Sequence, residues 1–248
     1  MGESPPPVAP APVALVTGGS GGIGFACGEL LAKRGYDVLL TARREAPLRE
    51  AAERLGCRWK TADCSVEADV DALYEGETAV AMVVHAAGLY EGTLVRRQTV
   101  DVVDRVLAAN LRSAYLVASK ALPLMSAGGR IVFISSIASR GEPTLSAYSM
   151  SKAGENALAA ALAGEVEKQG IGVHLVTPGP VDTPMFGDYV ANVPTLHADD
   201  VARAVGWLEE MPPHVVVREI VLEPVTSGPF VPSRSAREST QPAGASDA

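Results

Sequence analysis

Thr17-Gly18-Gly19-Ser20-Gly21-Gly22-Ile23-Gly24 closes an apolar stretch that begins at Val13, and a segment with helical periodicity, about residues 22 to 34, follows it. A strand, a glycine-rich turn and a helix N-terminus in this order form an anion site, because glycine allows positive φ and close backbone approach and the helix end presents free N–H groups. The turn lacks the final Lys-Ser/Thr of a P-loop, which argues against a kinase or NTPase. It predicts a site for a dinucleotide pyrophosphate; a glycine-rich turn without a ligand is the alternative.

The rest of the chain alternates short β-branched runs with longer amphipathic segments. The predicted strands are residues 13–17, 37–41, 58–61, 80–85, 130–135, 172–177 and 219–222. The predicted helices are about 22–34, 45–55, 66–75, 100–126, 147–169 and 198–210. This order predicts an α/β fold with a doubly wound, mostly parallel, seven-stranded sheet and helices on both faces, whose ligands bind beyond the carboxyl ends of the strands.

The amino-acid composition limits the number of domains and the classes of partner that the protein could bind. The 248 residues are 47% hydrophobic and carry a formal net charge of −8, which suits one globular domain and argues against nucleic acid or an anionic membrane as a general partner. We expect this domain to span residues 13–230, between a disordered Pro-rich tail (1–12) and a second disordered tail (231–248).

Neither a membrane-spanning run nor a signal peptide is recognisable, so a cytoplasmic location is expected. The three cysteines, Cys27, Cys57 and Cys64, have no metal-ligand spacing and are interpreted as buried or partly buried thiols in a reducing compartment. The sequence therefore predicts neither a disulfide nor a metal site.

Two arginines follow the second predicted strand, at the expected place of the adenosine ribose. The strand ends in Thr41-Ala42-Arg43-Arg44, without the acidic residue that would accept a hydrogen bond from the 2′-hydroxyl of NAD. Arginine instead suits the 2′-phosphate of NADP, so NADP(H) is expected in preference to NAD(H), unless Arg43 and Arg44 are merely solvated. Asp63-Cys64, after the third strand, lies at the same edge; Asp63 could accept from the adenine amine or cap the next helix.

A second group of residues with acid–base chemistry lies in the other half of the chain. Tyr148 and Lys152 are four residues apart near the start of a helix and so point the same way. A phenol is a poor acid or base at neutral pH, but a neighbouring ammonium stabilises its phenolate, so that Tyr148 could exchange a proton with a substrate oxygen. Ser135-Ser136 ends a predicted strand, and a hydroxyl there can hold the same oxygen.

Taken together, the motifs resemble the short-chain dehydrogenase/reductase family. Six of them occur in the family's order over about residues 13 to 190: Thr17-Gly-x-x-x-Gly-Ile-Gly24, His85-Ala-Ala-Gly88, Asn110, Ser135-Ser136, Tyr148-x-x-x-Lys152 and Pro178-Gly179-Pro180-Val181-Asp182-Thr183. The resemblance implies a Rossmann-like domain and reversible hydride transfer between NAD(P)(H) and a small alcohol or carbonyl compound.

The resemblance also implies roles for individual residues. Tyr148 would be the general acid/base, Lys152 would lower the energy of its phenolate and hold the nicotinamide ribose, Ser136 would polarise the substrate oxygen, and Asn110 would hold a water that links Lys152 to solvent. Thr183 would contact the nicotinamide amide, unless it is a helix cap. The complete expected set of cofactor-binding residues is Gly18, Ser20, Gly22, Ile23, Gly24, Arg43, Arg44, Asp63, Cys64, Ala86, Ala87, Gly88, Tyr148, Lys152, Pro178, Gly179, Val181 and Thr183.

Several positions depart from the family pattern. Ser136 lies 12 residues before Tyr148, one fewer than is usual, so Ser135 remains a candidate for the catalytic serine. His85 replaces an asparagine and is interpreted as a structural histidine at the end of a buried strand. The segment from Met185 to Leu196 is short, so the substrate cannot be named. A catalytically silent NADP-binding sensor or scaffold is the alternative function.

The longest predicted helices also suggest an assembly. The helices from about residues 100 and 147 are apolar on more than one face, as in Ala157-Leu-Ala-Ala-Ala-Leu-Ala163. A homodimer or homotetramer formed through them is expected, and ordinary core packing is the alternative.

Overall fold

A single parallel sheet organises the chain, as the computed structural model shows for the residues that it describes, 10–185 and 193–225. Seven strands lie in the order β3-β2-β1-β4-β5-β6-β9, and every neighbouring pair is parallel. The strands are β1 (Val13–Thr17), β2 (Asp37–Ala42), β3 (Arg58–Thr61), β4 (Met82–His85), β5 (Arg130–Ile134), β6 (Gly172–Pro178) and β9 (Glu219–Leu222). The predicted doubly wound, seven-stranded α/β fold is confirmed.

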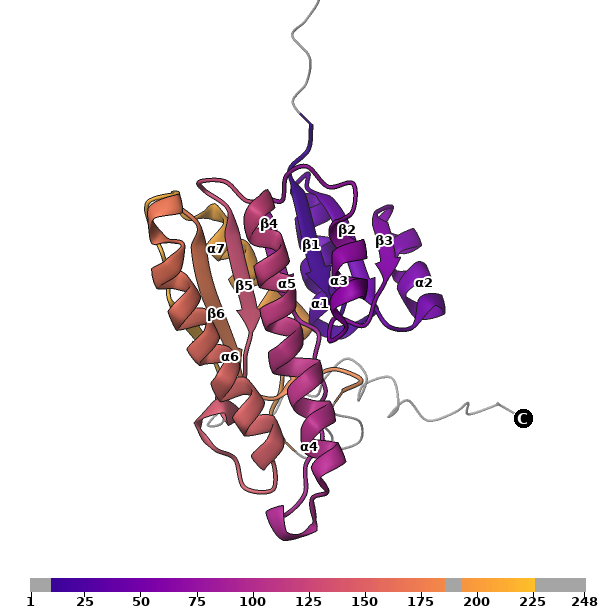
Figure 1. Cartoon of the computed structure of the whole chain (residues 1–248), viewed down its shortest axis with the longest axis vertical. Coiled ribbons are helices and arrows are strands. Elements are labelled where there is room, and N and C mark those ends of the chain that lie inside the picture. Colours follow the sequence, from indigo (N-terminus) through magenta and orange to yellow (C-terminus); the bar gives the residue numbers. More distant parts are fainter. Residues whose placement is uncertain (1–9, 186–192, 226–248) are drawn as a thin grey trace, which may run out of the picture.

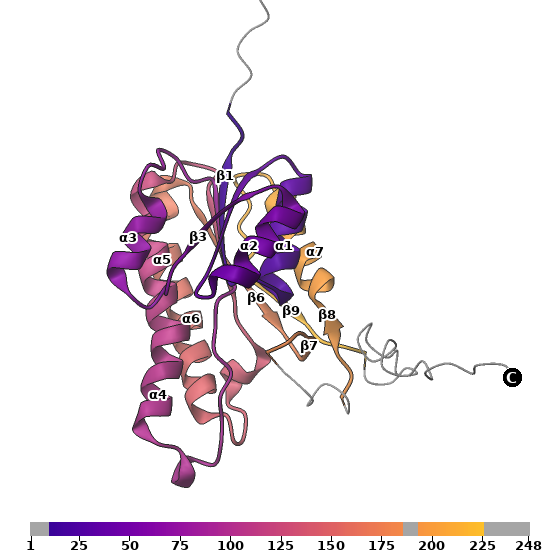
Figure 2. The same ribbon diagram turned by 90° about the vertical axis from the view of Figure 1, so that its right-hand side faces the viewer.

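Helices cover both faces of the sheet (Figure 1, Figure 2). On one face lie α3 (Glu67–Tyr74), α5 (Ser113–Ala121) and α6 (Ser146–Glu165), and on the other lie α1 (Gly22–Lys33), α2 (Glu45–Leu55) and α7 (Ala198–Glu210). α4 (Val100–Leu107) continues the line of α5 beyond the sheet and packs against α6. The helix ranges predicted from periodicity match these closely, because each amphipathic face packs on the sheet.

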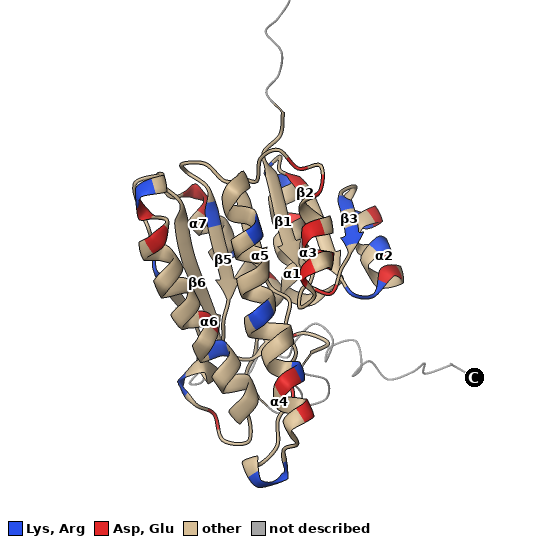
Figure 3. Ribbon diagram, viewed as in Figure 1, with Lys and Arg blue, Asp and Glu red and all other residues tan. Residues whose placement is uncertain are grey.

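Two apolar layers form the core, one on each side of the sheet. One contains Leu15, Val83, Ile131 and Phe133 with residues of α3, α5 and α6, and the other contains Val16, with residues of α1, α2 and α7. All residues of β4 and β5 are buried, as expected for central strands that are covered on both faces. Most charged residues lie on the outer surfaces, where Figure 3 shows both signs interspersed over the helices; Arg130, Lys152 and Glu155 are buried exceptions.

Apart from shifts at the ends of elements, the structure differs from the predicted elements in two places. The helix expected over residues 100–126 is interrupted by a π-helical segment, Ala108–Arg112, and ends in the 3-10 turn Leu122–Leu124. In addition, β7 (Val181–Asp182) and β8 (Leu196–His197) form a separate two-stranded parallel sheet after β6. Both features depend on tertiary contacts that a local hydrophobic pattern does not encode.

Several expectations fall outside the described residues. These are the disordered tails, of which only residues 10–12 are described, and most of the substrate-side segment, residues 186–192. In the described part of the chain, no helix is both long and apolar enough to cross a membrane. The three cysteines are free thiols, and Cys27 and Cys64 are buried, in agreement with the interpretation of the sequence.

Candidate active site

The glycine turn lies at the carboxyl end of β1, between β1 and α1. Gly18 has φ +69° and Gly22 has φ +52°, values that glycine adopts without the steric cost of a side chain. A Cβ on Gly18 would lie 2.8 Å from the carbonyl oxygen of Ala86, and one on Gly24 would lie 2.4 Å from that of Gly18. The turn is therefore so tightly folded that these positions exclude larger residues.

The helix that follows this turn is suited to bind an anion. α1 begins after Gly21 with no side-chain cap and with no acidic residue in its first turn. Its first backbone N–H groups thus lack a side-chain acceptor, and the helix dipole adds partial positive charge there. A Cβ on Gly21 would meet nothing within 4 Å among the described residues, so the backbone is accessible from outside. This cradle fits a pyrophosphate.

Thr17 connects the glycine turn to the neighbouring loop. Its Oγ1 accepts hydrogen bonds from the backbone N–H groups of Ala86 (3.1 Å) and Ala87 (3.0 Å) and lies 3.1 Å from Nδ1 of His85. Because two donors already point at this oxygen, its own proton goes to Nδ1, and Nε2–H then donates to the Ser113 hydroxyl at 3.1 Å. Burial and the charge of Lys152 lower the pKa of His85 to about 3. His85 is thus a neutral, structural histidine, as the sequence indicated.

Tyr148 and Lys152 lie on the buried face of α6, near the carboxyl end of β5. Tyr148 is 8% exposed, and its ring contacts that of Tyr90 edge-on at a centroid distance of 5.1 Å. The Lys152 ammonium donates to the carbonyl oxygen of Ile134 and to Oε2 of Glu155, both at 2.7 Å. Burial lowers the pKa of Lys152, but Glu155 and Tyr148 outweigh burial, so the pKa lies above its usual value. The ammonium is therefore charged beside the phenol.

The two serines at the end of β5 have different surroundings. The hydroxyl of Ser135 is buried and donates to Oδ1 of Asn156 at 2.5 Å, so it stabilises the contact with α6. Ser136 is partly exposed and precedes the 3-10 turn Ile137–Arg140, which packs on α6; its Oγ accepts from the N–H of Ala138 at 3.2 Å. The hydroxyl proton of Ser136 is therefore available to a substrate oxygen, whereas that of Ser135 is not. This favours Ser136 over Ser135 as the serine that could bind a substrate.

Asn110 lies within the π-helical segment and is fully buried. Its Oδ1 accepts from the N–H of Leu89 (2.6 Å), and its Nδ2 donates to the carbonyl oxygen of Leu89 (3.1 Å) and to Oγ of Ser151 (2.8 Å). A Cβ on Gly88 would lie 3.2 Å from Oδ1, so glycine there lets Asn110 approach. Asn110 therefore holds the loop after β4 against α6. π segments often occur at functional sites.

The predicted ribose end of the site lies after β2 and β3. β2 extends to Ala42, one residue farther than predicted, so Arg43 is the first residue beyond the strand, and Thr41 is buried within it. Arg43 and Arg44 are both exposed, and Arg44 precedes α2.

Asp63 is close enough to Arg43 to interact with it. Burial raises the pKa of Asp63, but hydrogen bonds from Ser65 and the charge of Arg43 outweigh burial and lower it. Oδ1 of Asp63 accepts from the backbone N–H of Ser65 (2.9 Å) and from its hydroxyl (2.7 Å), so Asp63 stabilises the turn before α3. The neighbouring Cys64 is a buried thiol.

The segment after β6 closes the site from the other side. A Cβ on Gly22 would lie 3.1 Å from Cγ2 of Thr183, so Thr183 lies against the glycine turn. Pro178 ends β6, the N–H of Gly179 donates to the carbonyl oxygen of Leu222 at 2.7 Å, and Val181 is buried in the core. The fold thus brings most of the predicted residues to the carboxyl edge of the sheet.

Comparison with a family model settles the relationship. Residues 12–193 match the model described as short chain dehydrogenase. The chain belongs to the short-chain dehydrogenase/reductase family. It is therefore an oxidoreductase of a family that uses NAD(P)(H), and the expected resemblance is confirmed.

Individual relatives agree with this assignment. An uncharacterized oxidoreductase of Staphylococcus epidermidis is 32% identical over 224 residues, which cover 86% of this short-chain dehydrogenase/reductase and 97% of the relative. A solved structure of a short chain dehydrogenase/reductase family protein superposes with a TM-score of 0.78 at 30% identity, covering 86% of this chain and 95% of the other. An actinorhodin polyketide ketoreductase, crystallised with NADPH, gives a TM-score of 0.76 at 28% identity, with coverages of 85% and 95%.

The sequence does not predict a role for three residues that contact the site. Thr17 accepts from the N–H of Ala87, Ser151 accepts from Asn110, and Glu155 accepts from Lys152. The i, i+3 spacing of Lys152 and Glu155 was the available signal for the last of these. Among the described residues, no group of three or more His, Cys, Asp and Glu side chains could hold a metal ion.

Proposed function

We propose that this oxidoreductase interconverts a carbonyl compound and a secondary alcohol, with NADP(H) as its preferred cofactor and Tyr148 as the general acid/base. The observation that carries the proposal is the buried pair of Tyr148 and the charged Lys152, on the same face of α6 and at the edge of the sheet that holds the glycine cradle. When bound, the nicotinamide would supply or accept a hydride.

The side chains of the site then divide the proton chemistry among them. In the reductive direction Tyr148 donates its hydroxyl proton to the substrate oxygen, and in the oxidative direction its phenolate takes that proton back. The Lys152 ammonium stabilises the phenolate, and the hydroxyl of Ser136 donates a hydrogen bond to the same substrate oxygen. Asn110 holds a water that links Lys152 to solvent.

The Lys152 ammonium has three N–H groups, but only two of its acceptors have been described above. Its three N–H groups have Ile134 O and Glu155 Oε2 as acceptors, which leaves one N–H for the nicotinamide ribose. The other proposed cofactor contacts are with the pyrophosphate, the adenosine and the nicotinamide amide. They involve Gly18, Ser20, Gly22, Ile23, Gly24, Asp63, Cys64, Ala86, Ala87, Gly88, Pro178, Gly179, Val181 and Thr183.

The preference for NADP(H) rests on Arg43 and Arg44. Both are exposed beyond the end of β2, where a 2′-phosphate could accept charge-assisted hydrogen bonds. A related ketoreductase crystallised with NADPH supports the same choice.

The decisive experiment is a screen of NADPH oxidation over ketones, aldehydes and 3-oxoacyl thioesters, repeated with NADH. The wild-type protein should turn over at least one carbonyl class, faster with NADPH. Tyr148→Phe should bind NADPH almost normally but lose turnover by about 10²–10⁴-fold, the usual contribution of a general acid. Full turnover by Tyr148→Phe would refute the mechanism, and complete inactivity of a wild-type protein that binds NADPH tightly would favour an NADP-binding sensor.

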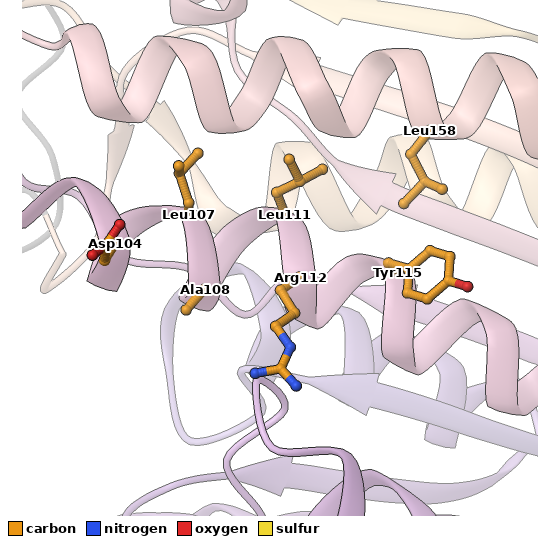
Figure 4. Close-up of a pocket in the computed structure, with 7 residues that line it drawn as sticks. All are labelled: Asp104, Leu107, Ala108, Leu111, Arg112, Tyr115 and Leu158. Atoms are coloured by element: carbon orange, nitrogen blue, oxygen red, sulfur yellow. The ribbon is translucent and has the colours of Figure 1, made fainter.

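We also propose that the protein acts in the cytoplasm as a homodimer or homotetramer. An apolar groove of about 510 Å³ lies along α4, α5 and α6, lined by Leu107, Leu111, Tyr115 and Leu158 (Figure 4). Tyr115 is 57% exposed there. Asp104 and Arg112 also line this groove, eight residues and thus about two helical turns apart. A two-fold axis that passes between them would bring Asp104 of one copy to Arg112 of the other. We therefore propose that a second copy of this chain occupies the groove.

A further inference from the structure

Glu155 is a buried carboxylate within the active site. It is 0% exposed and lies three residues after Lys152 on α6, with its Oε2 2.7 Å from the Lys152 ammonium. Its other oxygen, Oε1, has no hydrogen-bond partner among the described residues. A buried carboxylate with half of its acceptors unused is costly, because an apolar residue of similar volume would pack there without that desolvation. Packing alone therefore does not explain Glu155.

Among the titratable groups described around the Lys152 ammonium, Glu155 is the carboxylate that can balance its charge. On α6, Tyr148 interacts with Lys152; from β4, His85 lies close enough for the ammonium to depress its pKa, so this histidine stays neutral. Tyr90 contributes an aromatic ring against Tyr148, and β5 contributes only the carbonyl oxygen of Ile134 to the ammonium. Burial raises the pKa of Glu155, while the Lys152 ammonium opposes that rise. The ammonium that interacts with Tyr148 is therefore the same one that Glu155 holds in a buried ion pair.

We propose that Glu155 is a positioning residue whose negative charge fixes the Lys152 ammonium and offsets part of the positive charge beside the Tyr148 phenol. The geometry supports both parts. Together with Ile134 O, Glu155 Oε2 fixes two of the three N–H directions of the ammonium, and its charge offsets part of the positive charge beside the phenol. The proposal rests on the proposed role of Tyr148 as the acid.

A direct titration of the phenol tests this without substrate or cofactor. Tyrosinate absorbance is followed against pH in the wild-type protein and in Tyr148→Phe, and the difference isolates Tyr148 from the other five of the chain's six tyrosines. The same difference is measured between Glu155→Gln and the double variant Glu155→Gln/Tyr148→Phe. Glu155→Gln should lower the midpoint of the Tyr148 ionisation by about one pH unit, the effect of removing one nearby charge. An unchanged or raised midpoint in a folded variant would overturn the proposal.

Two further variants keep the test decisive. Glu165→Gln removes the same charge from an exposed position on the same helix and should not move the midpoint. An equal shift in this control would show a general charge effect and would also overturn the proposal. If Glu155→Gln does not fold, Glu155→Asp takes its place: it moves the carboxylate away by one methylene and should give a smaller shift in the same direction, whereas no shift would refute the role.

The enzymatic counterpart is the pH–rate profile of carbonyl reduction. Its high-pH limb should move to lower pH in Glu155→Gln by about the same amount as the spectroscopic midpoint. A merely structural role of Glu155 would lower the amount of folded protein but leave that limb in place. Should the wild-type protein reduce no carbonyl compound, the proposed function fails, while the spectroscopic titration still decides the role of Glu155.

Discussion

Arg43 is the residue on which the choice between the two dinucleotides depends most. It lies exposed immediately after β2, and its charge reaches Asp63 across the expected ribose site. Arg43→Asp should weaken NADPH binding by about 10–100-fold, because a charge-assisted hydrogen bond is lost and a repulsive charge is gained, while NADH binding changes little. Fluorescence titration with both cofactors measures this. Arg203→Asp, the same change on exposed α7, is the control; equal losses for NADPH and NADH in Arg43→Asp would contradict the assignment.

His85 should make the fold sensitive to acid. Burial lowers its pKa from 6.5 to about 3 and that of His174 to about 4, so in the folded protein both stay neutral where the unfolded chain already binds protons. The unfolded state therefore gains stability as pH falls from about 6.5 towards 3–4, and each histidine removes up to about 1.4 kcal/mol per pH unit from the free energy of unfolding.

Urea unfolding between about pH 7 and pH 4.5 measures this slope. His85→Asn, which cannot titrate, should reduce the slope, whereas His214→Asn, at an exposed position, should leave it unchanged. An identical slope in His85→Asn and in the wild-type protein would show that the histidine is not held neutral.

At the residue scale, the sequence predicts site residues that belong to a motif, but not the residues that contact them in the fold. Tyr148 and Lys152 follow from residue type and spacing, which also indicate a serine at position 135 or 136. The contacts of Thr17 with Ala86 and Ala87, by contrast, join residues about 70 positions apart, and a pattern in one sequence does not encode such a pairing. The distinction between Ser135 and Ser136 likewise required the position of Asn156 on α6.

Among the elements, the glycine turn is the one with least room for change. A Cβ on Gly24 would lie 2.4 Å from the carbonyl oxygen of Gly18 and 2.9 Å from that of Thr17, both of which are backbone atoms. Gly24→Ala should therefore displace the turn, destabilise the fold by about 1–3 kcal/mol and weaken NADPH binding at least about tenfold.

Thermal unfolding and cofactor titration measure these two effects. Gly164→Ala provides the matched control, because a Cβ at this helical position meets nothing within 4 Å among the described residues; it should leave binding unchanged and stabilise slightly. Normal NADPH affinity in Gly24→Ala would refute the importance of this close packing.

The strand and helix order was predictable because each element's hydrophobic period agrees with its place in the sheet. The π-helical segment and the pair β7–β8 were not, because neither has a period of its own. In the π-helical segment, the side chain of Asn110 binds Leu89 in the loop after β4 and Ser151 on α6. Element boundaries and irregular segments thus depended on contacts, whereas the framework followed from local pattern.

For the whole molecule, the groove along α4, α5 and α6 predicts association of two copies. Light scattering should give at least a dimer, and Tyr115→Glu should shift it towards the monomer, because a charge would be buried in an apolar interface. Val66→Glu, at an exposed apolar position before α3, should not change the assembly. A wild-type monomer at all concentrations would exclude this use of the groove.

The position of β1 between β2 and β4 also has a consequence for synthesis of the chain. β1 pairs with β2 on one side and with β4 on the other, although β4 begins at Met82, more than sixty residues after β1. While the ribosome makes that intervening segment, on the order of several seconds, one edge of an apolar strand has no partner and is open to other chains. The same strand that places the glycine turn inside the finished sheet is thus, in the nascent protein, the edge that a chaperone would need to cover.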